Sequence, residues 1–312
     1  MWLSALAVPA PHCEAILRRS QLTSGALAAA ALTLNAFVWG VSWWPFRVLQ
    51  GHGLHPLWAT AIIYVFALLC LLTLKPYAWR GLLQHPVLWW LVLASGLTNV
   101  GFNWAVTVGD VVRVVLLFYL MPAWVVLLAW PLLGEKPTAG SVLRLVLALA
   151  GVVIVLKTPA SPWPVPESLA DWLALMGGFC FALTNILLRK LNQTPGESRM
   201  LAMFGGGAVM ATSAALIGMA LGLVEAPPAP GLAWSVVALG ISLAFLAGNL
   251  ALQYGAAHLS ASATSLIMLS EVVFASVSSV VLGTGELSTR TLLGGGLILM
   301  ASLLAVVSFG KR

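Results

Sequence analysis

The sequence predicts an all-α membrane protein of ten transmembrane helices, built from two inverted five-helix repeats. Three observations support this prediction: an apolar composition, ten apolar segments separated by turns, and an internal repeat. Hydrophobic residues make up 61% of the 312-residue chain and charged residues only 8%, and the mean hydropathy is +1.00. Because a soluble domain carries roughly 25% charged residues, this chain cannot cover its own surface with charges, and lipid must cover it.

Ten segments are apolar enough to be transmembrane helices, which need roughly 20 residues each. Glycine and proline mark the breaks between them, as in Gly51-His52-Gly53 and Ala226-Pro227-Pro228. The predicted spans are 23–46, 56–74, 87–108, 111–133, 139–156, 169–188, 200–223, 232–252, 260–282 and 287–308. They divide the chain into a cytoplasmic N-terminal segment (1–22), a first repeat (23–158), a stiff proline-rich linker (159–167) and a second repeat (168–312).

The internal repeat is clearest in two segments, 117–140 and 266–289. Each has an apolar approach, a special residue in mid-span (Pro122 or Glu271), a second apolar run and a small-residue turn before Glu135 or Glu286. The mid-span residues are 149 positions apart. Because five helices are an odd number, the second copy enters the membrane from the opposite side, which is the arrangement that secondary transporters use for alternating access.

The basic residues predict the orientation of the chain. With the N-terminus in the cytoplasm, inside segments hold 11 of the 15 lysines and arginines and outside segments hold 4. This positive-inside bias places both termini in the cytoplasm. The net charge of +6 follows from the same bias and requires no nucleic-acid partner.

Three sequence motifs resemble the drug/metabolite transporter superfamily, in its EamA-type ten-helix members. They are the run Trp39-Gly40-Val41-Ser42, the spacing from Pro122 to Glu135, and the run from Tyr254 to Ser288. Within that family, the run 108–113 followed by 117–124 is similar to bacterial aromatic amino-acid exporters of the YddG type. The resemblance implies a bacterial inner-membrane location, efflux of small metabolites and a central cavity between the repeats.

Polar and aromatic side chains inside apolar spans are the candidates to bind substrate, because such groups are costly in lipid unless they face the bundle interior. The predicted substrate-binding residues are Asn35, Trp39, Trp43, Asn103, Tyr119, Asn185, Gln253 and Tyr254. Asn35, Trp39 and Trp43 follow one helical face at a spacing of four. For the asparagines the alternative is a hydrogen bond to a neighbouring helix, and for the tryptophans it is an interfacial belt.

Four further residues have two readings each. Glu271 is the acidic residue deep inside a span, and it serves either in proton coupling or in a structural hydrogen bond. Pro122, its counterpart in the first repeat, is expected to bend a helix rather than bind a ligand. Asp110 and Arg113 are expected to pair with each other, or to guide a substrate at the outer side.

Other function classes lack their sequence signatures. There is no phosphate-binding loop, no metalloprotease motif and no nucleophile elbow, so we expect neither an enzyme nor an ATP-driven pump. The three cysteines are scattered, and we expect no cofactor and no metal.

The predicted function is export of small metabolites, most of all amino acids with aromatic or large apolar side chains. The alternatives are a general drug/metabolite exporter and a non-transporting receptor or structural protein. The predicted partners are the substrate and the lipid bilayer, and no particular oligomeric state is predicted.

Overall fold

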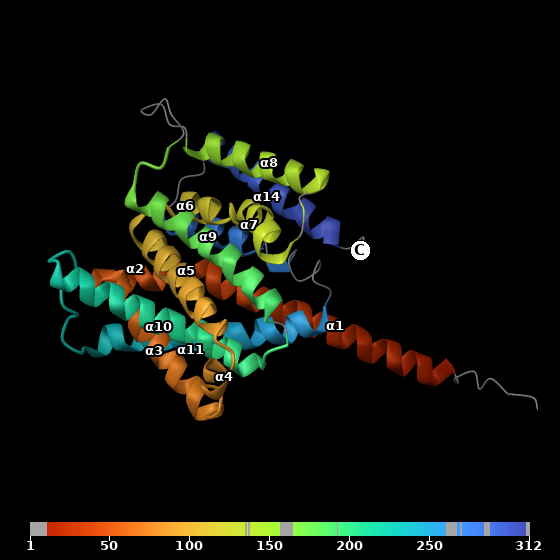
Figure 1. Ribbon diagram of the computed structural model, residues 1–312, viewed down its shortest axis with the longest axis horizontal. Helices are drawn as coiled ribbons and strands as arrows, with labels where there is room; N and C mark the ends of the chain where they lie inside the picture. The colour runs from red at the N-terminus through yellow and green to blue at the C-terminus, as the bar shows by residue number, and fades with distance from the viewer. Residues whose placement is uncertain are drawn as a thin grey trace, which may run out of the picture.

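All regular structure is helical in the computed structural model, which describes residues 11–134, 136, 138–156, 165–191, 193–259, 267, 268, 270–283 and 288–309 (Figure 1). The helices are α1 (Pro11–Val41), α2 (Trp43–Gly51), α3 (Pro56–Leu74), α4 (Arg80–Gln84), α5 (Leu88–Val108), α6 (Val111–Phe118), α7 (Met121–Leu133), α8 (Ala139–Leu156), α9 (Leu169–Lys190), α10 (Gly196–Ala220), α11 (Leu232–His258), α13 (Ser270–Val281) and α14 (Thr289–Phe309). The repeat glutamates Glu135 and Glu286 lie outside the described residues.

Seven helical segments of the described chain are long and apolar enough to cross a membrane. Three further apolar helices, over 142–155, 270–281 and 289–301, fall in the predicted spans but are shorter. The chain is therefore an all-helical, multi-pass membrane protein, and the number ten stays a prediction. The first helix begins at Pro11, inside the segment predicted to precede the first span. Of the predicted linker, only residues 165–167 are described, and they are not helical.

Two of the predicted spans are broken helices. The first span divides at Ser42, whose hydroxyl and backbone N–H both donate to the carbonyl of Trp39, at 2.8 and 3.2 Å. The fourth span divides at Tyr119 and Leu120, between α6 and α7. Pro122 stands in the first turn of α7 and has no N–H to donate to the carbonyl of Phe118, so the helix cannot continue through this point unbroken.

Side chains near the helix starts satisfy the free backbone N–H groups. Ser168 and Asp171 form a capping box at the start of α9. Asp110 caps α6 by accepting the backbone N–H of Arg113 at 2.8 Å, and His55 caps α3 ahead of Pro56. These three caps mark where α9, α6 and α3 begin.

The helices pack as two connected groups. Figure 1 shows α8 beside α14 at one end of the molecule and α3 beside α10 at the other, with α5 between them packed against α9 and α10. α1 packs against α11 and α13. The pair α8 and α14 is in reciprocal contact: a β-carbon on Gly151 would lie 2.6 Å from the backbone oxygen of Gly294, and one on Gly294 would lie 2.7 Å from that of Gly151. Only glycine permits these two helix backbones to approach so closely.

Candidate functional site

Tyr119 joins the two repeats at the break between α6 and α7. Its hydroxyl donates to Glu271 Oε2 at 3.1 Å and reaches the backbone oxygen of Met268 at 3.5 Å. Met268 follows Tyr119 by 149 residues, the same offset that aligns Pro122 with Glu271. The side chain of Tyr119 therefore contacts the backbone of the residue at the equivalent position of the second repeat, as residues near a twofold axis between the repeats would.

Asn35 reaches the same junction from α1. Its amide nitrogen contacts the sulfur of Met268 at 3.4 Å, and the residue is 1% exposed. The amide oxygen of Asn35 has no hydrogen-bond partner among the described residues. We name the Tyr119–Glu271–Met268–Asn35 set the central junction. It combines side chains from α1, from the break before α7 and from the start of α13.

Aromatic rings lie on α1 one turn beyond Asn35. Trp39 is half-buried and stacks on Phe245 of α11, with ring centroids 4.4 Å apart and an interplanar angle of 18°. It also meets Phe102 edge to face at 6.3 Å. On the other side of Phe102, Phe118 stacks on Phe181 at 5.3 Å. The rings form a continuous aromatic core between the repeats, next to Tyr119.

Asn103 belongs to a separate polar network between α3 and α5. Its amide nitrogen donates to Thr60 at 3.3 Å, and the hydroxyl of Tyr64 donates to the amide oxygen of Asn99 at 2.6 Å. Asn103 is fully buried, and its amide oxygen has no partner within the described chain. The network satisfies most of its groups internally, as polar contacts between membrane helices do.

The remaining predicted residues lie apart from the central junction. Trp43 is 2% exposed and donates its indole N–H to Ser278 at 2.9 Å, so it joins α2 to α13. Asn185 bonds back to its own helix at Phe181 and contacts the sulfur of Met121 at 3.5 Å. Gln253 and Tyr254 are exposed on the last turns of α11. Asn35, Tyr119 and Glu271 are thus the predicted residues that the fold brings together.

Arg113 and Asp171 form an ion pair that the sequence analysis missed. The expected side-chain pair of Arg113 with Asp110 is wrong, because Asp110 instead caps α6 through the backbone. The guanidinium of Arg113 binds both carboxylate oxygens of Asp171, at 2.8 and 2.9 Å, and also donates to the carbonyl of Val155 at 2.9 Å. The capping-box spacing of Ser168 and Asp171 was the sequence signal that marked this carboxylate as ordered.

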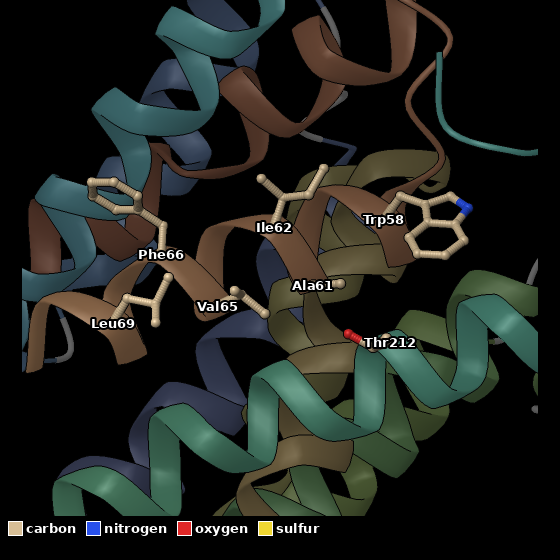
Figure 2. Close-up of a pocket in the computed structure, with 7 residues that line it drawn as sticks. All are labelled: Trp58, Ala61, Ile62, Val65, Phe66, Leu69 and Thr212. Atoms are coloured by element: carbon tan, nitrogen blue, oxygen red, sulfur yellow. The ribbon is translucent and has the colours of Figure 1, made fainter. Parts of the chain in front are cut away.

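A hollow of about 400 Å³ lies between α3 and α10, away from the central junction (Figure 2). Apart from Thr212 of α10, its lining comes from one face of α3. Val65 and Leu69 in this lining are 40% and 57% exposed, so the hollow opens on the outer surface of the bundle. Its polar groups are the Thr212 hydroxyl and the indole N–H of Trp58, which donates to the carbonyl of Glu225 at 3.0 Å, so it offers no charged group to a metabolite.

The described residues contain no group of three or more histidine, cysteine, aspartate or glutamate side chains that could hold a metal ion. The arrangement instead defines a class: a multi-pass helical membrane protein whose two homologous halves meet at buried polar groups.

The chain belongs to the EamA-like transporter family, whose model matches residues 26–157 and again residues 168–307. One solved crystal structure is similar, at 19% sequence identity and a TM-score of 0.53, over 89% of this chain and 97% of the other. At this identity the likeness shows the fold alone. A search of curated proteins found no match. The family membership establishes a membrane transporter with two repeats and agrees with the duplication found in the sequence.

Proposed function

We propose that the protein is a secondary transporter of the bacterial inner membrane that exports small metabolites by alternating access. Its best substrates are amino acids with aromatic or large apolar side chains, as in exporters of the YddG type. Both termini face the cytoplasm, and the two repeats are inverted. A general drug/metabolite exporter is the second candidate, because the aromatic core around Trp39 would suit many apolar compounds.

The observation that supports this proposal most is the contact between Tyr119 and Met268. Equivalent residues touch where the repeats meet, and a site on the axis between inverted repeats is open to one side or the other as the halves rock. The broken helices α6 and α7 supply backbone and side-chain polar groups at the same place, as transporter sites do. We propose that Asn35, Trp39, Tyr119 and Glu271 contact substrate there. Asn103, Asn185, Gln253, Tyr254 and Trp43 are proposed to line or support the path on either side.

The test is transport by the purified protein in proteoliposomes. A panel of radiolabelled amino acids should show saturable uptake, fastest for phenylalanine, tryptophan, tyrosine and leucine, and faster counterflow when the same amino acid is preloaded inside. Liposomes without protein give the background. A channel would show no saturation and no counterflow, and a receptor or structural protein would show no flux at all.

A further inference from the structure

Glu271 has no positive partner at the central junction. Of its two carboxylate oxygens, Oε2 alone accepts a hydrogen bond from a described residue, the hydroxyl of Tyr119 at 3.1 Å. The side chain is half-buried in the first turn of α13. A carboxylate at membrane depth is costly without a compensating charge or proton. No cation of the described residues contacts it, so a proton or a positively charged group of the substrate is the compensation that remains.

The surrounding helices supply no cation near the central junction. The sequence has no lysine, arginine or histidine between His258 and Arg290, and none in α3 or α5. On α1, Arg18 and Arg19 stand about four helical turns before Asn35. Arg47, the basic residue of α2, donates to the carbonyls of Val106 and Gly109. Arg113, the basic residue of α6 and α7, binds Asp171 and Val155. Neither guanidinium is available to a substrate carboxylate at the central junction.

The junction also offers more acceptors than donors. The amide oxygen of Asn35 is buried without a donor among the described residues. Like Oε1 of Glu271, it is an oxygen acceptor without an N–H donor among the described residues. An ammonium group carries three such donors and a positive charge, whereas a carboxylate carries none and would be repelled by Glu271.

We infer that the central junction recognises the protonated amine of its substrate and does not require a carboxylate. This inference rests on the proposed transport function and narrows its substrate class to aromatic and large apolar primary amines, amino acids included. The apolar part of such a molecule fits the aromatic core at Trp39, Phe245 and Phe102, which lies one turn along α1 from Asn35. Compounds that keep the ring but carry only a carboxylate are excluded.

The inference is tested by measuring how tightly small molecules bind to the purified protein in detergent. Vesicles are avoided because the neutral form of an amine crosses a lipid bilayer without a transporter. Isothermal titration would compare phenethylamine, phenylalanine, N-acetylphenylalanine and 3-phenylpropanoate. We expect phenethylamine to bind at least as tightly as phenylalanine. We expect both to bind at least about tenfold more tightly than the two anions, the value of one charge-assisted hydrogen bond. Equal affinity for 3-phenylpropanoate and phenethylamine would overturn the inference.

Variants of Glu271 distinguish the effect of losing its charge from the effect of disturbing the fold. Glu271→Gln should weaken phenethylamine binding at least about tenfold, and Glu271→Asp should keep the preference for amines. Val273→Ala is the matched control, because Val273 is 57% exposed on the same helix and should leave the affinity unchanged. If Glu271→Gln binds phenethylamine as the natural protein does, or if Glu271→Asp loses the preference for amines, the inference is wrong. If phenylalanine is transported in proteoliposomes but anions bind equally well, the proposed function stands and only the inference falls. If no compound is bound or transported, both fall.

Discussion

Arg113 and Asp171 connect the two repeats through a two-pronged ion pair at the start of α6 and α9. The carboxylate is 2% exposed and the guanidinium side chain 23%. The carboxylate of Asp171 also accepts the backbone N–H groups of Glu167 and Ser168, and Arg113 reaches the end of α8 at Val155. One ion pair therefore ties three helix ends together on the side predicted to be external.

Removal of the carboxylate should destabilise the protein, because it leaves the guanidinium partly buried and unpaired. We expect Asp171→Ala to cost about 3 kcal/mol, the lower end of the range for a broken buried pair, since Arg113 keeps some contact with solvent. The matched control is Asp110→Ala, which removes a helix cap and a more distant charge but breaks no ion pair, and it should cost about 1 kcal/mol. Thermal unfolding of the detergent-solubilised variants measures both. Equal losses would show that the ion pair adds nothing beyond a cap.

The close approach of α8 and α14 gives a second pair of matched variants. Gly294→Ala places a methyl group against the backbone oxygen of Gly151, so the helices must separate, at a cost of about 1–3 kcal/mol. Gly296→Ala adds the same group two residues away, where nothing lies within 4 Å. It should stabilise the helix slightly, because alanine is the better helix former. Melting temperatures that fall for Gly294→Ala and hold or rise for Gly296→Ala confirm the packing, and similar changes in both contradict it.

The apolar runs of the sequence predicted where most spans lie, because burial in lipid leaves a strong compositional signal. The breaks inside two spans were harder to foresee. At Pro122 the sequence predicts a bend, but the helix ends at Phe118, because the missing N–H leaves the preceding turn without its bond. At Ser42 the hydroxyl competes with the backbone N–H groups for the carbonyl of Trp39. Many serines in helices do not form such a hydrogen bond, so the sequence alone does not predict the break.

The candidate site was predicted in part for a similar reason. Asn35, Tyr119 and Glu271 are conspicuous as polar groups in apolar spans, so sequence reasoning found them. Met268, which contacts both Asn35 and Tyr119, is an ordinary apolar residue, and only the repeat offset of 149 distinguishes it in the sequence. Arg113 was paired with its neighbour Asp110, since the sequence gives no sign of which distant carboxylate folding brings near. Tertiary partners follow from helix packing, which the linear pattern does not contain.

His55 should make stability depend on pH. Its Nδ1 accepts the backbone N–H of Leu57 at 3.2 Å and caps α3, a role open only to an unprotonated nitrogen. Partial burial lowers the pKa of His55 from its ordinary value of 6.5. The unfolded chain then takes up the proton first as pH falls, so the stabilising contribution is complete above pH 6.5 and is lost below it.

The test of this pH dependence is the variant His55→Asn, which keeps a capping side chain but does not titrate. Melting temperatures measured from pH 8 to pH 5 should fall for the natural protein relative to the variant. Parallel curves for the two proteins would show that His55 does not contribute to the pH dependence.

The predicted topology is open to labelling with a membrane-impermeant thiol reagent. In a variant without the native cysteines, a cysteine at Ala229, in the exposed loop between α10 and α11, should be labelled in intact spheroplasts. A cysteine at Gln193, exposed between α9 and α10, should be labelled only after lysis. The opposite pattern would reverse the orientation, and labelling of both in intact cells would contradict the assignment of α10 as a membrane span.

Glu271 should couple transport to the proton gradient, because it is the carboxyl at the contact between the repeats and its neighbour Tyr119 is a neutral hydroxyl. Glu271→Gln keeps the shape and still accepts the Tyr119 hydroxyl, but it cannot release a proton. At substrate concentrations well above its affinity it should still exchange substrate across proteoliposomes, and it should lose the accumulation that a pH gradient drives. Tyr119→Phe, which removes only the hydrogen bond, should retain gradient-driven accumulation at a reduced rate.

If Glu271 is a structural group alone, Glu271→Gln will accumulate substrate as the natural protein does, and Glu271→Ala will chiefly lower the yield of folded protein. If the natural protein equilibrates substrate without any response to a pH gradient, it is a facilitator, and the coupling role of Glu271 is wrong whatever its variants do.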